Sequence, residues 1–270
     1  MSERFLPAVE MTIIMLKKIW VILILFAGLA LATPVLADAT STPATPVLMY
    51  HYVRDYNRPN DKIGMNLSIS PANFHKQLDL IEKLGYTPTT FKAIKDGTAP
   101  AKPIILTFDD GYRDFYTNVY PELKARQIPA VTFLIYNALD KKNYLTKDMV
   151  REMLASGLVE VGSHTLNHPD LPYIRSAKAL REITDSKIFL ERDFNINIIT
   201  FCYPYGQINK QVVADVAEAG YTYALTTKHG LADWRQPLIM DRYRVDNRTN
   251  LASQLKQHEI KAAKIKTRYQ

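Results

Sequence analysis

Two short segments of the chain carry residues whose types and spacing suit metal-assisted hydrolysis. Asp109 and Asp110 stand side by side at the end of one apolar segment, and His164 and His168 follow another, later in the chain. One carboxylate and two imidazoles can hold a divalent metal while leaving a coordination position for water or substrate. The second carboxylate, kept off the metal, can act as a base on that water. Together the two segments indicate a metal-dependent hydrolase.

Each segment alone is a weak signal. An Asp-Asp-Gly sequence after a strand is most often a polar turn, and two histidines at this spacing are often surface residues. Both segments, however, follow apolar, β-branched runs that are typical of buried parallel strands. The carboxyl ends of such strands meet at one edge of a sheet, where α/β folds place their sites. This agreement favours a catalytic site.

Apolar segments that are typical of strands recur along the chain, and helical patterns fall between most of them. The candidate strands cover residues 47–50, 104–108, 130–135, 159–162, 198–203, 221–226 and 239–245, with a further short strand at 86–90. The expected helices cover residues 71–84, 115–126, 146–156, 176–194 and 210–219. This alternation favours a single α/β domain folded as a (β/α) barrel over an open doubly wound sheet. No glycine-rich phosphate loop supports nucleotide binding.

The amino-terminal residues have the pattern of a secretory signal peptide. Lys17 and Lys18 precede an uncharged run over residues 19–32, and small residues follow up to Ala37, after which cleavage is expected. An uncleaved membrane anchor is the alternative, because the stretch from residue 19 to 37 is nearly long enough to span a bilayer. Residues 38–46 are expected to form a flexible linker, so that the folded domain covers residues 47–270. We expect an exported protein, periplasmic or secreted.

Charge and cysteine content narrow the possible partners. The formal net charge is +7, and residues 1–37 contribute three basic and two acidic side chains, which leaves +6 for the mature chain. The basic tail (256–268) can favour anionic envelope polymers or a membrane surface, although a solvated helix face is the simpler interpretation. Nucleic acid is not expected, because the chain contains no recognisable module for it. The single cysteine, Cys202, excludes an intrachain disulfide.

From residue 47 to about 245 the chain resembles the polysaccharide deacetylases, the carbohydrate esterase family 4 or NodB-homology group. The sequence TFDDG at 107–111 is similar to the first motif of that family, and SHTLNH at 163–168 is similar to the second. The resemblance implies a distorted (β/α) barrel of seven or eight strands. It also implies that Asp109 is the general base and that the metal ligands are Asp110, His164 and His168. Zinc is the expected metal, and the same ligands also tolerate Co²⁺ or Ni²⁺.

The chain departs from the common family pattern in two places. The sequence FCYPYG at 201–206 resembles the third motif, but Cys202 stands where that motif has an arginine that orients the base. The common Leu-x-x-His near the carboxyl end is missing, whereas LMYH at 48–51 stands at the start of the domain. This order resembles the circularly permuted branch, which includes poly-N-acetylglucosamine de-N-acetylases of biofilm matrices. The first and last strands of a closed barrel are neighbours, so a strand moved from end to start keeps its place beside the site.

The permuted order implies further catalytic roles. His51 is expected to be the general acid that donates a proton to the leaving amine. A carboxylate neighbour should hold up its pKa; Asp233, in a segment similar to the fourth motif, is the first candidate and Asp241 the second. Arg242 is expected to replace the missing arginine and to pair with Asp109, which keeps that base ionised.

Aromatic residues near the expected strand ends can bind sugar rings. The residues expected to contact substrate are Tyr112, Tyr203, Pro204, Tyr205 and Trp234. The backbone amide of Tyr112 is also a candidate for stabilising the oxyanion. The leading hypothesis is removal of N-acetyl groups from an extracellular or cell-envelope polysaccharide that contains N-acetylglucosamine. The alternatives are hydrolysis of O-acetyl esters on a glycan and a catalytically silent glycan-binding domain.

Overall fold

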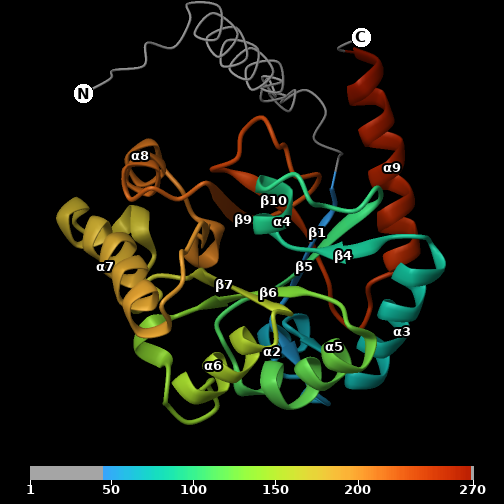
Figure 1. The fold of residues 1–270 in the computed structure, drawn as a ribbon, viewed down its shortest axis with the longest axis horizontal. Coiled ribbons are helices and arrows are strands. Elements are labelled where there is room, and N and C mark those ends of the chain that lie inside the picture. Colours follow the sequence, from blue (N-terminus) through green and yellow to red (C-terminus); the bar gives the residue numbers. More distant parts are fainter. Residues whose placement is uncertain (1–44, 269–270) are drawn as a thin grey trace, which may run out of the picture. The chain divides into compact units, whose positions relative to one another are not determined.

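Seven parallel strands close into a barrel in the computed structural model, which describes residues 45–268 (Figure 1). In the order in which they pair, the strands are β1 (Val47–Tyr50), β5 (Pro103–Phe108), β6 (Ala130–Leu134), β7 (Val159–Ser163), β8 (Thr200–Cys202), β9 (Tyr223–His229) and β10 (Met240–Arg244). The ring closes because β1 pairs with both β10 and β5. The predicted barrel and its seven strands are confirmed. The short strand β4 (Thr87–Thr89) pairs with β5 outside the ring.

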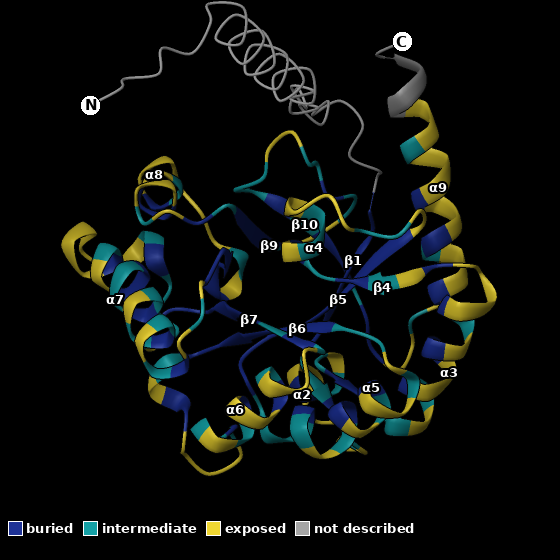
Figure 2. Cartoon of the chain, viewed as in Figure 1, coloured by how far each residue is buried: buried dark blue, intermediate teal, exposed yellow. Residues whose placement is uncertain are grey.

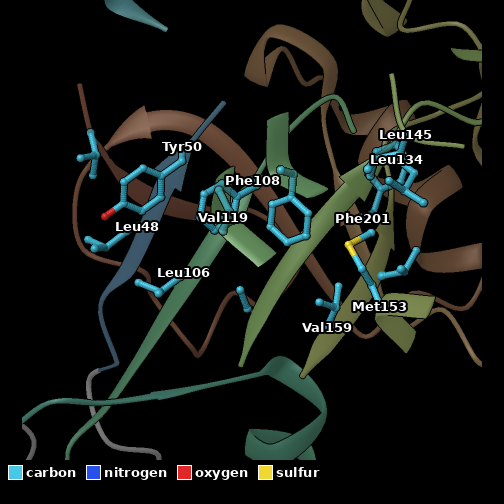
Figure 3. Close-up of a cluster of buried hydrophobic side chains, with 14 of the residues drawn as sticks. Leu48, Tyr50, Leu106, Phe108, Val119, Leu134, Leu145, Met153, Val159 and Phe201 are labelled. Atoms are coloured by element: carbon cyan, nitrogen blue, oxygen red, sulfur yellow. The ribbon is translucent and has the colours of Figure 1, made fainter. Parts of the chain in front are cut away.

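The strands are buried on both faces, which explains their almost continuous apolar sequences. Because side chains alternate along a strand, one set fills the barrel and the other packs under the surrounding helices. The inner set includes Val47, Ile105, Val131, Phe133, Leu225 and Met240. The outer set includes Leu48, Tyr50, Leu106, Phe108, Leu134 and Phe201, shown in Figure 3.

Helices surround the barrel and expose their outer faces, as Figure 2 shows for α7 and α9. The predicted helices are present as α3 (Pro71–Lys83), η2 (Phe115–Val119) continuing into α5 (Tyr120–Arg126), α6 (Lys147–Ala155), α7 (Ser176–Phe194) and α8 (Lys210–Glu218). The start of α3, α6 and α8 is fixed by a side-chain cap on a backbone N–H, from Ser70, Thr146 and Asn209 respectively.

Short elements that the sequence did not predict complete the connections. They are β2 (Tyr52–Val53), α2 (Lys62–Asn66), β3 (Ser68–Ile69), α4 (Phe91–Lys95) and the single turns η3 (Tyr136–Ala138), η4 (Leu171–Tyr173) and η5 (Pro204–Gly206). The basic tail forms α9 (Leu251–Arg268), which buries Leu251 and Leu255 and exposes Lys256, Lys261 and Lys264. Within residues 45–268, no helix is both long enough and apolar enough to span a bilayer.

Aromatic residues fill the amino-terminal end of the barrel. The ring of Phe91 lies 5.4 Å from that of Tyr223 and 6.0 Å from that of Trp234. The indole N–H of Trp234 donates to the carbonyl of Thr45 at 3.4 Å. Thr45 and Pro46, the last residues of the expected linker, are buried here. The remainder of that linker (38–44) and the expected signal peptide or anchor (1–37) lie outside the described residues.

Glu160 on β7 is a half-buried carboxylic acid near this end. One of its carboxyl oxygens accepts the N–H of Lys92 in the first turn of α4 at 2.9 Å. The other oxygen is buried. Burial raises the pKa of Glu160 to about 7, although the bond from Lys92 opposes this shift.

The substitution Glu160→Gln is therefore expected to stabilise the protein at neutral and alkaline pH. The folded state holds a proton on Glu160 between its ordinary pKa of 4.5 and about 7, so stability falls as pH rises through this window. Removing the charge should raise the free energy of unfolding by about 1–3 kcal/mol near pH 8 and by much less near pH 5. Guanidinium unfolding at both pH values measures this. An equal gain at both pH values would contradict it, and Glu218→Gln, exposed on α8, is the control.

Candidate active site

Five of the seven expected metal-binding and catalytic residues line one pocket of about 660 Å³ at the carboxyl ends of the strands. His51 follows β1, the two aspartates follow β5, and His164 follows β7. The pocket is lined by His51, Asp109, Asp110, His164 and His168, together with residues of the surrounding loops. Parallel strands bring these positions together because their carboxyl ends share one rim of the barrel.

The turn after β5 separates the two adjacent aspartates. Asp110 and Gly111 both have left-handed backbone conformations, with φ of 74° and 73°. A side chain on Gly111 would meet Leu134 of β6, since an added Cβ would lie 2.9 Å from its Cδ2 atom. Glycine at this position therefore permits the close turn. The turn directs Asp109 into the barrel and leaves Asp110 to face the histidines.

Asp110, His164 and His168 have the geometry of a three-ligand metal site. The Oδ1 atom of Asp110 lies 3.3 Å from Nε2 of His164 and 3.5 Å from Nε2 of His168. Two ligands held tetrahedrally by zinc at 2.0–2.1 Å are about 3.3–3.4 Å apart, so the spacing fits such an ion. The Nδ1–H of His164 donates to the carbonyl of Cys202 at 2.6 Å, which turns the lone pair of Nε2 toward the other two ligands.

A buried glutamate that the sequence did not reveal holds the loop that carries His168. Glu182 of α7 accepts hydrogen bonds from the backbone N–H and the side-chain amide of Asn167, both at 2.8 Å. The N–H of His168 donates to Oγ1 of Thr165 at 2.9 Å. These bonds hold the loop that carries His168. Only the burial of a glutamate on the inner face of α7 could have indicated this role.

Arg242 and Asp109 form a fully buried, two-point ion pair, as the sequence predicted. The Nη1 and Nη2 atoms of Arg242 donate to the two carboxylate oxygens at 2.7 and 2.8 Å. The Nε–H of Arg242 donates to the carbonyl of Thr226. Burial alone would raise the pKa of Asp109, but the charge and hydrogen bonds of Arg242 outweigh burial and hold that pKa well below its ordinary value. Asp109 is therefore a carboxylate.

Cys202 lies beside this pair. Its Sγ atom is 3.2 Å from Nη2 of Arg242 and 3.5 Å from Oδ2 of Asp109. Burial raises the pKa of the Cys202 thiol, so the group stays protonated and can donate to the carboxylate. Arg242 on β10 thus provides the guanidinium, while Cys202, at the third-motif position on β8, provides a thiol.

His51 is close to Asp109 but not to the carboxylates expected to support it. Its Nε2 atom lies 3.7 Å from Oδ2 of Asp109, and 12% of its side chain is exposed. Burial lowers the pKa of His51, and the charges of Asp109 and Asp110 offset this only in part. The resting imidazole is consequently neutral at neutral pH.

The expected support of His51 by Asp233 or Asp241 is wrong. Asp233 is held by Arg235 through bonds of 2.8 and 2.9 Å, and Asp241 pairs with Lys228 at 3.0 Å. Neither carboxylate lines the pocket. Asp233 lies in the loop that covers the opposite end of the barrel with Trp234, which explains its distance from His51.

Two of the five expected substrate contacts line the pocket. Tyr112 stacks on Tyr52 with ring centres 3.7 Å apart, and the exposed Tyr205 places its ring 4.6 Å from that of His168. The sequence overlooked Tyr144, which packs against Tyr112 and also lines the pocket.

The other three expected contacts are corrected by the structure. Tyr203 is buried and donates its hydroxyl to the carbonyl of Leu238, and Pro204 is also buried. Trp234 packs at the amino-terminal end of the barrel. Tyr205 differs because its left-handed backbone, with φ of 57°, turns it away from the strand direction.

Comparisons with known proteins agree with this geometry. A family model described as polysaccharide deacetylase matches residues 96–224, which include both the aspartate pair and the histidine pair. The poly-beta-1,6-N-acetyl-D-glucosamine N-deacetylase of Staphylococcus aureus is 28% identical over 204 residues, covering 66% of this chain and 70% of that protein.

Two solved structures share both sequence and fold. The polysaccharide deacetylase BC0361 of Bacillus cereus is 32% identical with a TM-score of 0.70, over 79% of this chain and 68% of that one. The deacetylase PplD of Streptococcus pyogenes, solved with acetate, is 30% identical with a TM-score of 0.71, over 79% of this chain and 97% of that one. With this identity across nearly a whole relative, and with the aspartates and histidines assembled in one pocket, the chain belongs to the polysaccharide deacetylase family.

Proposed function

We propose that this protein removes N-acetyl groups from a polysaccharide that contains N-acetylglucosamine, using a divalent metal, outside the cytoplasm. The observation that carries the proposal is a buried, ionised base next to a ready three-ligand site in one pocket. The activity named for the Staphylococcus aureus relative supports the N-acetylglucosamine substrate. The basic flank and apolar run before Ala37 support export to the periplasm or the medium, with or without a membrane anchor.

The three ligands suit a divalent metal of intermediate softness. Asp110, His164 and His168 would hold it, and their mixed oxygen and nitrogen donors suit zinc best, with cobalt or nickel as substitutes. When bound, such an ion polarises the acetyl carbonyl and lowers the pKa of water in the pocket. The described residues provide three ligands, which leaves room for water and substrate.

Asp109 takes the proton from the attacking water. Arg242 keeps both oxygens of Asp109 ionised and fixes their direction, because its two N–H groups form parallel bonds to the carboxylate. The oxyanion that develops on the acetyl carbon needs a donor in place before the reaction, and the backbone amide of Tyr112 is our candidate.

His51 delivers the proton that the leaving amine requires. The resting imidazole is neutral, so it must first receive a proton, and the nearby oxygen of Asp109 is 3.7 Å away. The proton that leaves water can thus pass from Asp109 to His51 and then to the departing nitrogen. Breaking the C–N bond then gives acetate and a free amine and restores both residues.

Metal removal should abolish turnover, and zinc should restore it. We would strip residues 38–270 of metal, reload the protein with zinc and follow acetate release from N-acetylglucosamine oligomers by mass spectrometry. Release that depends on zinc, together with loss of zinc binding in His168→Ala, is the expected result. Tight zinc binding with release only from O-acetyl esters would replace the amide substrate by an ester. Zinc binding without release from either substrate would contradict the proposal.

His51→Ala should lower amide hydrolysis by about 10²-fold or more, because the amine must then leave without its proton donor. An aryl acetate has a leaving group that needs no proton, so its hydrolysis should fall much less. Rates on both substrates measure the difference. Equal losses would assign His51 a structural role. The control is His75→Ala, because His75 is a surface histidine that contacts Asp79 and Glu122 on the outer helices.

A further inference from the structure

Arg244, the last residue of β10, lines the pocket and is half-buried. Asp109 and Asp246 are the carboxylates whose charges act on it. Both carboxylates form ion pairs with other arginines. Asp109 accepts two hydrogen bonds from Arg242 and one from the thiol of Cys202, and Asp246 pairs with Arg248 at 2.6 Å. Within residues 45–268, the guanidinium of Arg244 therefore has no hydrogen-bond acceptor and no ion-pair partner.

A second cation faces the same pocket from another wall. Lys141 lies in the loop after η3, is exposed, and forms no ion pair within the part of the chain that the structure describes. Its neighbour Asp140 accepts the backbone N–H of Lys147. The acidic groups of the pocket, Asp109 and Asp110, are occupied by Arg242 and by the metal-binding histidines. The positive charges of Arg244 and Lys141 are thus available to a ligand in the pocket.

From these observations we propose that the pocket recognises an anionic group on the substrate: Arg244 binds a carboxylate or phosphate on a sugar next to the one that loses its acetyl group, and Lys141 adds long-range attraction. This inference rests on the proposed deacetylation. A guanidinium that has lost part of its hydration without gaining a partner is unfavourable, and an incoming anion removes this cost. The planar fork of five donors matches both carboxylate and phosphate geometry. The expected substrate is an acidic polysaccharide of the envelope or its surroundings.

The test uses three oligomers with one backbone. A neutral 1,4-linked N-acetylglucosamine oligomer, the same oligomer with some C6 groups oxidised to carboxylates, and the same oligomer phosphorylated at some C6 hydroxyls share one backbone and differ only in the group at C6. The zinc-loaded enzyme should show kcat/KM at least tenfold higher on one of the two acidic oligomers, and that oligomer identifies the anion. Arg244→Gln should bring the ratio of kcat/KM on the acidic oligomer to that on the neutral oligomer close to one, chiefly by raising KM for the acidic oligomer. Arg244→Lys should keep part of the preference for the acidic oligomer, because the charge remains.

Matched controls separate recognition from general effects. Lys141→Gln should reduce the preference less than Arg244→Gln, and mainly at low salt, because an exposed charge is screened. Arg181→Gln removes a positive charge from the exposed face of α7 and should leave the preference unchanged. A kcat/KM on the neutral oligomer equal to that on both acidic oligomers would overturn the inference. An equal loss of kcat/KM on all three oligomers in Arg244→Gln would also overturn it. Absence of acetate release from any oligomer would instead count against the proposed deacetylation.

Discussion

Asp109→Asn is expected to lower kcat/KM for deacetylation by about 10³-fold, because the amide cannot accept the proton of the attacking water. The three proposed metal ligands are other residues, so zinc affinity should stay within a few-fold of the wild-type value. Acetate release and zinc titration on the same protein sample measure the two quantities. Asp148→Asn, at an exposed position of α6, is the control for the loss of one carboxylate.

Acetate release and zinc affinity, measured together, distinguish a catalytic base from a metal ligand. Loss of turnover with zinc binding retained is the signature of the base. Parallel loss of both would place Asp109 in the metal site and would contradict the division of roles between the adjacent aspartates. Retained turnover would show that another group accepts the proton.

Arg242→Met should destabilise the protein by about 3–5 kcal/mol, because it leaves the carboxylate of Asp109 buried without its partner. Arg242 is fully buried and meets both oxygens of Asp109, so water cannot easily replace it. Deacetylation should fall as well, since the base loses both its charge partner and its orientation. Guanidinium unfolding and acetate release measure the two effects.

Two double variants test whether the charge or the packing of Arg242 matters. Arg242→Met with Asp109→Asn leaves neither charge buried alone, so part of the lost stability should return. Arg242→Met with Cys202→Arg supplies a guanidinium from β8, and Sγ of Cys202 lies 3.5 Å from the carboxylate that it must reach. This variant should recover both stability and turnover in part. If neither double variant recovers stability, the cost of the single change comes from lost packing.

The barrel could be predicted from the sequence, because strands that are buried on both faces have almost continuous apolar sequences. The longer helices were equally clear from their periodicity and from caps such as Ser70 and Asn209. The helices α2 and α4 have five residues each, too few to show a helical period. Their positions depend on what they cover, such as the barrel end that Phe91 fills.

Within the site, residues in ordered motifs at strand ends were predictable, because the topology alone brings strand ends together. Trp234 and Asp233 were misplaced because a loop's composition does not say over which end of the barrel it folds. Glu182 and Arg244 escaped notice for a different reason. A glutamate on a helix and an arginine on a strand become unusual only when burial and the absence of neighbouring partners are known.

The chain reaches the barrel at Thr45, whose carbonyl is held by Trp234 at the end opposite the pocket. Any attachment that acts through the amino-terminal side, such as immobilisation on a solid support, therefore joins the folded domain at the floor of the barrel, at the end opposite the pocket. The fold thus gives the molecule a direction, with one end available for attachment and the other for catalysis.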